Sequence, residues 1–360
     1  MRSERRYIGL MGLMGLMGLV GLMGLVGCSM IDEDQSDCDQ QARIDYELRL
    51  VTNMETEIET QLSTETEQSL ADDLRRFLSS IFTDFAHDVD LSFYDTVGDS
   101  VRLQHDQHIM DANQATYTLN LPMRQYMHLA AANLLNNAQV NLVGDEHCHP
   151  SMLQQVSGDT VASHTTGLFT ARQPMDVLGN VDQNFNVRLY MANCAAVLVV
   201  DPRDVDPSEM SVYTTGFATG YHICDSSYTF GKSPIVRTSL VGQAATGQPF
   251  AFCSVSFPSK PGVETRTVIE TEEPFISKEG DEDLWEFRVY VPAQDDEAST
   301  RGSRRITETI LRLKKRLKAG QLFILKGWLD RRGVFNTKDK TVGVSVTLDW
   351  NKNQEQDVPL

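Results

Sequence analysis

The sequence lacks the local signatures of several common enzyme classes. It contains no Gly-x-Ser-x-Gly elbow, no His-Glu-x-x-His motif and no Gly-rich dinucleotide fingerprint. Nucleophilic, zinc-hydrolytic and nicotinamide chemistries therefore have no sequence support. A glycosidase-type carboxylate pair stays open, because such a pair is defined by its separation in space.

Positive charge is also scarce. The chain carries 32 Lys and Arg against 50 Asp and Glu, which gives a formal net charge of −18 at pH 7. Such a chain repels phosphate backbones and anionic lipid surfaces. We therefore expect no nucleic-acid partner, and we expect any membrane attachment to come from acyl chains.

The N-terminus has the three parts of an export signal. Arg2, Arg5 and Arg6 precede an apolar run at residues 8–26, and Gly27-Cys28-Ser29 follows it. A small residue before cysteine resembles the lipobox of bacterial lipoproteins. This resemblance predicts a signal peptide at 1–27 and an acylated (palmitate-bearing) Cys28 as the first mature residue. A transmembrane helix is the alternative, because about 19 apolar residues just span a bilayer.

Residues 28–41 are predicted to form an acidic tether. The stretch 29–37 contains four carboxylates and no basic residue, so like-charge repulsion keeps it extended. It also resembles the acidic surface-export signal that follows the lipid cysteine in Bacteroidetes lipoproteins. The two interpretations are compatible, and together they predict a cell-surface protein held at the outer membrane through lipid on Cys28.

Five cysteines remain after Cys28, namely Cys38, Cys148, Cys194, Cys224 and Cys253. An exported compartment permits disulfides, but an odd number cannot all pair within one chain. We expect at most one or two bridges, whose pairing stays open, and some buried thiols that behave as small apolar groups.

Alternation of apolar and polar residues predicts a mainly β protein. Residues 43–50 alternate without a break, which is typical of a half-buried antiparallel strand. Similar runs lie at 89–93, 116–121, 138–143, 186–191, 195–200, 250–257, 285–291, 321–330 and 342–350. The length suffices for two domains. We therefore predict two consecutive antiparallel β-sandwiches at 42–179 and 180–360, with the boundary near the turn pair Gly179-Asn180, which Gln173-Pro174 precedes.

One short helix is predicted in the first domain. Thr64 and Glu67 have the spacing of a capping box. Apolar residues follow at helical spacing: Leu70, Leu74, Phe77, Leu78 and Ile81. We expect this stripe to lie across a sheet edge or end. Residues 306–317 fit both a helix and a strand, and the surrounding strands favour the strand.

Possible metal ligands occur in two places. His147-Cys148-His149 offers three, but neighbours on an extended chain point to opposite sides and do not readily converge on one ion. The four carboxylates within 201–209 lack the glycine and the spacing of an EF-hand loop. We therefore predict no metal, no cofactor and no catalytic residue.

A basic concentration stands out in the acidic chain between residues 301 and 318. Its members are Arg301, Arg304, Arg305, Arg312, Lys314, Lys315, Arg316 and Lys318. A solvated edge protected from aggregation by its charges is the favoured interpretation. A docking patch for an acidic partner subunit is the alternative.

Several short motifs carry a family resemblance. They are the lipobox cysteine, the acidic mature start, Leu317-Lys318-Ala319-Gly320-Gln321 leading into a strand, the terminal Val344-Ser345-Val346-Thr347-Leu348-Asp349-Trp350, and Gly167-Leu168-Phe169. Together they resemble the FimB-type fimbrial anchor subunits of Bacteroidales. The resemblance implies two transthyretin-like sandwiches and a non-enzymatic minor subunit that attaches a fimbrium (pilus) to the outer membrane and limits its length. A fimbrial stalk subunit docks by adding a strand to an open sheet edge in this scheme.

Two other function classes stay open. A surface glycan-binding lipoprotein shares the anchor and the β-rich body but needs clustered exposed aromatics, whereas Trp285, Trp328 and Trp350 lie in strand patterns typical of a core. An exported hydrolase needs a concave site with perturbed carboxylates.

Overall fold

The computed structural model describes the chain from the first predicted strand onward, with gaps. The described residues are 41–51, 68–83, 85–97, 102–110, 116–135, 137–144, 152–179, 181–243, 247–260, 284–292 and 306–350. Cys28, the acidic tether, the predicted capping box and the loop at 147–149 lie outside them. The chain divides into two compact units, Met1–Gln41 and Ala42–Leu360, and all but the first of the described residues belong to the second.

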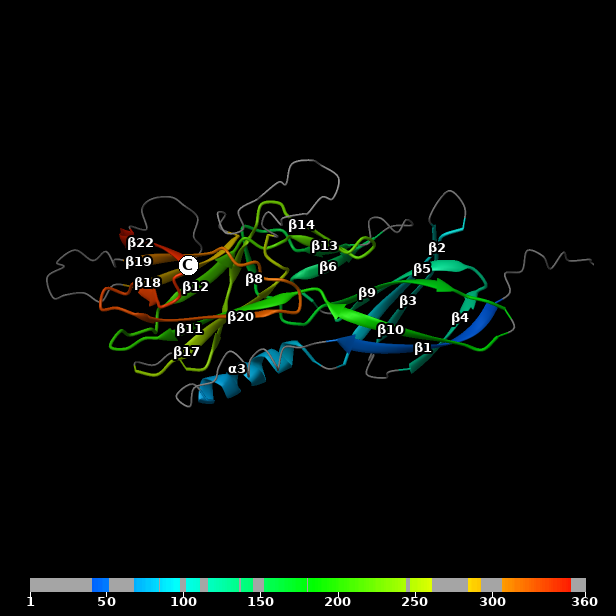
Figure 1. Cartoon of the computed structure of the whole chain (residues 1–360), viewed down its shortest axis with the longest axis horizontal. Helices are drawn as coiled ribbons and strands as arrows, with labels where there is room; N and C mark the ends of the chain where they lie inside the picture. Colours follow the sequence, from blue (N-terminus) through cyan, green and yellow to red (C-terminus); the bar gives the residue numbers. More distant parts are fainter. Residues whose placement is uncertain are drawn as a thin grey trace, which may run out of the picture. The chain divides into compact units, whose positions relative to one another are not determined.

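The second unit is mainly β, as the alternation predicts, and its strands form four sheets (Figure 1). The seven-stranded sheet has the order β3 (Arg102–Met110), β2 (Asp88–Asp95), β5 (Gln125–Ala132), β9 (Phe169–Asp176), β10 (Gln183–Met191), β1 (Gln41–Val51) and β4 (Thr116–Pro122). The four-stranded sheet has the order β14 (Ser227–Thr229), β13 (Gly220–His222), β7 (Met152–Gln155) and β6 (Val140–Val143).

The other two sheets come mostly from the second half of the chain. The five-stranded sheet has the order β16 (Ser239–Val241), β17 (Phe250–Ser256), β11 (Cys194–Asp201), β20 (Leu322–Leu329) and β21 (Phe335–Thr337). The six-stranded sheet has the order β22 (Val342–Trp350), β19 (Ile306–Leu313), β18 (Trp285–Pro292), β12 (Ser211–Thr215), β15 (Ile235–Arg237) and β8 (Thr160–Ala162). For the ambiguous stretch at 306–317, the prediction of a strand is confirmed over Ile306–Leu313 by β19.

Three of the four sheets contain a parallel pair, which corrects the prediction of antiparallel sandwiches. β1 runs parallel to β10, β11 parallel to β20, and β15 parallel to β8. The members of each pair are far apart in sequence, so no hairpin dictates their direction. Alternation along β1 reports which face is buried, and it carries no information about the direction of the neighbouring strand.

β11 is buried on both faces and links two hydrophobic cores. Val197 packs into the largest core cluster, which joins one face of the seven-stranded sheet to one face of the five-stranded sheet. Leu198, the next residue, packs into a second cluster with Phe287 and Leu311 of the six-stranded sheet. This double burial explains the uninterrupted apolar run at 195–200. A third cluster joins the four-stranded sheet to the other face of the seven-stranded sheet.

The helix α3 (Gln68–Ile81) forms where the apolar spacing predicts it, and its apolar stripe lies against a sheet edge as expected, at β16 of the five-stranded sheet. Leu70, Leu74, Leu78 and Ile81 are buried, and the helix contacts β16 and β17 (Figure 1). These strands belong to the second half of the chain, so the helix does not cover the first predicted domain alone. The helix shares a core with residues of the five-stranded and seven-stranded sheets. No described helix is long and apolar enough to cross a bilayer.

β9 contains the Gln173-Pro174 pair that precedes the predicted domain boundary. Both residues lie inside this strand, opposite His128 and Met127 of β5. β9 pairs with β10 only at Phe169 and Thr170, so at Pro174 the strand has a single hydrogen-bonded neighbour among the described strands. The missing N–H of proline is tolerated there because no second ladder needs it.

Strand pairing crosses the predicted domain boundary at 179/180 in both directions. β10 lies after the boundary and pairs with β9 and β1 in the seven-stranded sheet. β8 lies before it and pairs with β15 in the six-stranded sheet. The division into two domains stays a prediction.

Candidate functional site

A row of polar side chains crosses the β2–β3 pair at one edge of the seven-stranded sheet. Asp88, Asp90 and Ser92 alternate along β2 on one face, while residues 89, 91 and 93 pack into the largest core cluster. The antiparallel register places His108 opposite Asp90 and Asp106 opposite Ser92. Two neighbouring strands thus bring three carboxylates, an imidazole and a hydroxyl to one surface.

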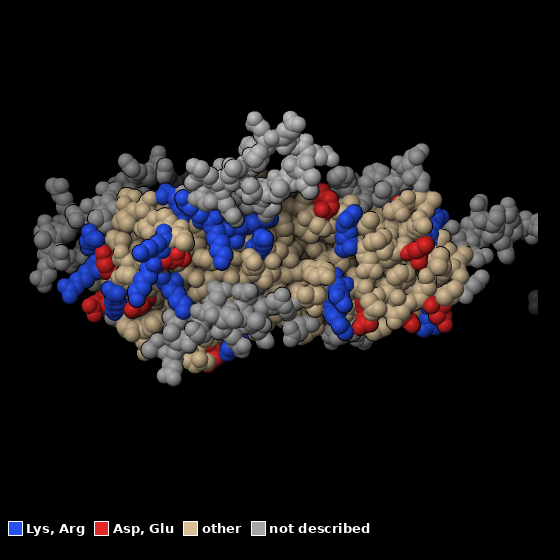
Figure 2. All heavy atoms as spheres, in the orientation of Figure 1, with Lys and Arg blue, Asp and Glu red and all other residues tan. Residues whose placement is uncertain are grey.

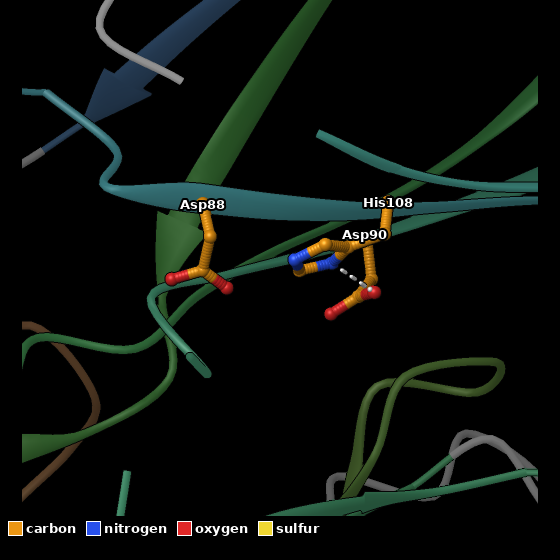
Figure 3. A group of neighbouring side chains, drawn as sticks. All are labelled: Asp88, Asp90 and His108. Atoms are coloured by element: carbon orange, nitrogen blue, oxygen red, sulfur yellow. Dashed lines mark hydrogen bonds and ion pairs between the residues drawn. The ribbon is translucent and has the colours of Figure 1, made fainter. Parts of the chain in front are cut away.

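Asp88, Asp90 and His108 form the tightest part of this row (Figure 3). Nδ1 of His108 lies 2.7 Å from Oδ1 of Asp90. The Asp88 side chain is 1% exposed, and its Oδ2 accepts hydrogen bonds from the backbone N–H groups of Leu134 (3.0 Å) and Leu135 (2.9 Å). Its Oδ1 is buried without a hydrogen-bond partner among the described residues. One candidate ligand atom from each of the three residues lies within 4.8 Å of the others.

Burial and the neighbouring charged groups change the pKa of the Asp90 carboxyl. Partial burial raises the pKa of the Asp90 carboxyl, and the charges of Asp88 and Asp106 raise it further, while the hydrogen bond and charge of His108 lower it. The net direction is upward. The hydroxyl of Ser92 donates to Oδ1 of Asp106 at 3.0 Å, which fixes the next carboxylate along the row. The local field attracts cations.

A cavity of about 360 Å³ opens beside the row, between β2, β5 and the residues around β6. Asp90, Ser92 and Asp106 supply its polar side. The remaining lining residues are Tyr94, Leu103, Leu129, Ala130, Ala131, Leu142, Gly144 and Ile223. A small cavity with an apolar floor and two carboxylates suits a small cation or a compact, partly apolar ligand. Among the described lining residues Tyr94 is the single aromatic one, and these residues do not include the clustered aromatics of a glycan site.

The edge strand β22 is a second surface with functional potential. Val342 is 9% exposed and packs into the second core cluster. Val344 and Val346 follow on the same face of the strand and are 47% and 43% exposed. Among the described strands β22 pairs with β19 alone. The core-facing side of the sheet is therefore incompletely covered at this edge.

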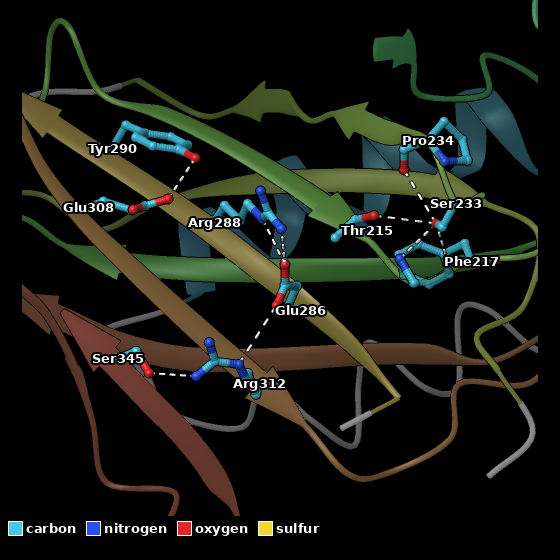
Figure 4. Close-up of polar contacts among 11 residues, drawn as sticks. Thr215, Phe217, Ser233, Pro234, Glu286, Arg288, Tyr290, Glu308, Arg312 and Ser345 are labelled. Carbon is cyan, nitrogen blue, oxygen red and sulfur yellow. Dashed lines mark hydrogen bonds and ion pairs between the residues drawn. The ribbon is translucent and has the colours of Figure 1, made fainter. Parts of the chain in front are cut away.

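Basic side chains gather over the region of β18, β19 and β22 (Figure 2). Several of them are held by neighbours on the outer face of the six-stranded sheet (Figure 4). Nε of Arg288 donates to Glu286 at 2.7 Å, and the Arg312 guanidinium lies 3.9 Å from the same carboxylate. Arg312 also donates to the hydroxyl of Ser345. Within the basic concentration this pairing involves Arg312, which lies on β19, whereas Lys314, Lys315, Arg316 and Lys318 follow the end of that strand.

The residues singled out from the sequence are not assembled into one site. Cys28 and the loop at 147–149 lie outside the described residues. Asp201 and Asp206 each accept a hydrogen bond from the backbone two residues onward, which is the geometry of ordinary turns. Trp285 is buried, as predicted. Trp328 is half-buried beneath Arg203, whose guanidinium carbon lies 4.7 Å from the ring centroid.

The cysteines follow the prediction of few bridges. Cys224 is disulfide-bonded, and its partner lies outside the described residues. Cys194 and Cys253 are unbonded and buried. Burial raises the pKa of both thiols, to about 12 for Cys253. They behave as small apolar core residues, as expected.

No protein-family model and no curated protein matches the chain. Solved structures that resemble it include fimbrial proteins, putative adhesins and a putative polysaccharide-binding protein. One is the fimbrial anchor protein Mfa2 from Porphyromonas gingivalis, with 10% identity and a TM-score of 0.42, covering 86% of this chain and 99% of that one. Another is a fimbrial assembly protein from Parabacteroides distasonis, with 12% identity and a TM-score of 0.35, covering 86% and 100%. Identities and TM-scores this low transfer no function, so function is argued from the chain's own residues.

Proposed function

We propose that this chain is a lipid-anchored fimbrial subunit, which attaches a fimbrium to the outer membrane, limits its length and docks a stalk subunit by strand addition. The N-terminal pattern ending at Cys28 supports the lipid anchor, and residues 28–41 provide the acidic tether. Acyl chains are needed for attachment, because a chain with a net charge of −18 is repelled by anionic lipid. More than one acyl chain is required for stable anchoring.

The observation that carries the docking step is the edge strand β22. The edges of the other sheets are less suited to pairing with a partner. β8, β14, β16 and β21 have three residues each and β6 has four. β4 ends in Pro122, and β3 carries Arg102, Asp106 and His108. Short strands, proline and charge are the devices by which natural sheets block edge pairing. β22 has nine residues, and Val342 to Thr347 contain no charge.

Val344 and Val346 are apolar side chains that an added strand can cover. Both lie on the face that Val342 buries in the second core. A strand hydrogen-bonded to the free edge of β22 extends this core, and its alternate side chains cover the two valines. The main-chain hydrogen bonds supply affinity and the apolar contacts supply selectivity.

Binding of sheared fimbriae to the purified full chain tests this proposal. The double variant Val344→Lys/Val346→Lys places two charges on the edge and should reduce capture of the stalk subunit at least tenfold. Val181→Lys is the matched control, because Val181 is 58% exposed and lies outside every strand. Equal capture by all three proteins contradicts docking at β22, and no capture by the unmodified chain contradicts the fimbrial proposal itself.

A further inference from the structure

The buried Asp88 carboxylate has hydrogen-bond partners at only one of its two oxygens among the described residues. Oδ2 is satisfied by two backbone N–H groups, but Oδ1 is buried without a hydrogen bond from any described residue. A buried carboxylate oxygen left unpaired costs free energy, because it has lost its water without gaining a partner. Such an orphan calls for an explanation.

The Asp88 carboxylate faces an imidazole that already has another carboxylate partner. In Figure 3 the His108 ring lies between Asp88 and Asp90, with one nitrogen bonded to Asp90 and the other directed toward Asp88. All three side chains project from the same face of the β2–β3 pair. Two carboxylates and one imidazole thus converge from neighbouring strands of a regular sheet.

We propose that Asp88, Asp90 and His108 bind a divalent transition-metal ion. The orphan oxygen of Asp88 becomes a ligand, and the ion offsets the repulsion between two adjacent carboxylates. Ligand atoms roughly 2 Å from one ion at tetrahedral angles lie roughly 3.3 Å apart. The present separations are within 4.8 Å, and rotation of the more exposed Asp90 and His108 side chains closes the difference.

The donor set selects the class of ion. Ca²⁺ and Mg²⁺ take oxygen ligands in sixfold or higher coordination, and this site offers two carboxylates and an imidazole. Imidazole suits zinc and the later first-row ions, and carboxylates are compatible with zinc. Zn²⁺ is therefore the best match, with Co²⁺ as its spectroscopic substitute.

The site has a structural consequence that is separate from the proposed fimbrial role. β3 is an edge strand, and the ion ties His108 on β3 to two residues of β2. Asp88 in turn holds the backbone of Leu134 and Leu135 through Oδ2. Three protein ligands leave a coordination position open, and Asp90 also lines the neighbouring cavity.

Metal titration of the chelator-treated full chain tests the proposal. Calorimetry with Zn²⁺ should show one equivalent bound, and Ca²⁺ should show none. Asp88→Asn keeps an acceptor oxygen for Leu134 and Leu135 while replacing the orphan oxygen. This variant and His108→Ala each remove a direct ligand of the ion. Loss of a residue that only hydrogen-bonds to a ligand typically weakens metal affinity by about 10- to 100-fold, so each variant should weaken Zn²⁺ binding by more than that.

Two controls separate this site from other ligands in the chain. His105→Ala removes an imidazole from the opposite face of β3 and should leave the affinity unchanged. His149→Ala tests the loop at 147–149. Bound Co²⁺ should show visible d–d bands without thiolate charge transfer, because no cysteine belongs to the site. Zn²⁺ should also raise the Tm of the unmodified chain and of His105→Ala, and should leave that of Asp88→Asn unchanged.

Three results overturn the proposal. They are no Zn²⁺ binding at millimolar concentration, equal affinity in Asp88→Asn and the unmodified chain, or binding that is lost in His149→Ala with a thiolate charge-transfer band. The first result leaves a hydrogen-bonded Asp-His-Asp cluster in its place.

Discussion

The hydroxyl of Tyr46 on β1 donates a hydrogen bond to Nε2 of His128 on β5, inside the seven-stranded sheet. Both side chains are fully buried. Nδ1 of His128 donates to the carbonyl of Ser92 at 3.1 Å, and its ring stacks on Phe93 with 4.3 Å between centroids. Burial lowers the pKa of His128 to about 4. The core therefore requires a neutral imidazole.

Acid should destabilise the fold through His128 and His164. His164 is also buried, and burial lowers its pKa to about 4. An unfolded histidine titrates near pH 6.5, so between about pH 6.5 and 4 the unfolded state binds more protons than the folded state. Stability is fully present above about pH 6.5 and falls as the pH decreases, by up to about 3 kcal/mol for each histidine. Urea unfolding at pH 7.5 and pH 4.5 measures the loss.

The variant His128→Gln/His164→Gln isolates this contribution, since all other titrating groups are kept. It should start less stable at pH 7.5 and lose less stability on acidification than the unmodified chain. Identical losses in the two proteins contradict the assignment of neutral, buried histidines.

Cys194 and Cys253 should resist thiol reagents in the folded chain. Both are fully buried, and burial raises the pKa of each thiol, so the reactive thiolate is scarce and inaccessible. Peptide mapping after labelling should find both residues unmodified in native protein and modified after denaturation. Rapid labelling of either residue in native protein argues against the burial of β11 and β17.

Gly216→Ala should be strongly destabilising. Gly216 has φ +102°, and an added Cβ lies 2.6 Å from both the carbonyl oxygen of Leu284 and the Cα of Trp285. Backbone atoms do not move aside readily, so we expect a loss of about 3 kcal/mol or more.

Gly247→Ala is the matched control for this position. Gly247 also has a positive φ, +78°, but no atom lies within 4 Å of the place that an added Cβ occupies. The Gly247→Ala substitution should lower the free energy of unfolding by only about 1–2 kcal/mol, through backbone strain. Chemical denaturation compares the two variants, and equal losses exclude steric contact as the cause at Gly216.

Cys28→Ala should move the protein from the membrane fraction to soluble or unprocessed forms. The apolar run ends at a small residue before Cys28, and acylation is the proposed source of membrane affinity. Fractionation with mass spectrometry of the N-terminus measures this. An intact signal peptide on the unmodified protein, with unchanged fractionation of the variant, refutes the lipid anchor.

The strands that sequence predicts well bury one face and leave the other in solvent. β1 and β10 belong to this group, because period-two alternation records the burial directly. β5 ends in Ala130, Ala131 and Ala132, all buried. Small residues buried on both faces leave no alternation, so no pattern predicts this strand. Sheet direction and the position of α3 depend on contacts distant in sequence, which no local pattern contains.

The Asp88–Asp90–His108 group shows why sequence patterns do not reveal the candidate site. Asp88 and Asp90 lie in or beside a predicted strand, but β3 is an edge strand that alternates weakly, with the polar residues His105 and Gln107 opposite the core residues Phe93 and Leu91 of β2. Without β3 there is no register to place His108 opposite Asp90. The sequence does contain one signal. Asp88 stands directly before the core residue Val89, and an aspartate is rarely fully buried unless it is paired.

Electron microscopy of cells and culture medium from a strain lacking this chain tests the central claim most directly. A lipid-held anchor that limits growth predicts fimbriae of altered length and their release into the medium, and predicts that Cys28→Ala fails to restore attachment. Fimbriae of normal length, attached to the cells in normal number without the chain, contradict the account.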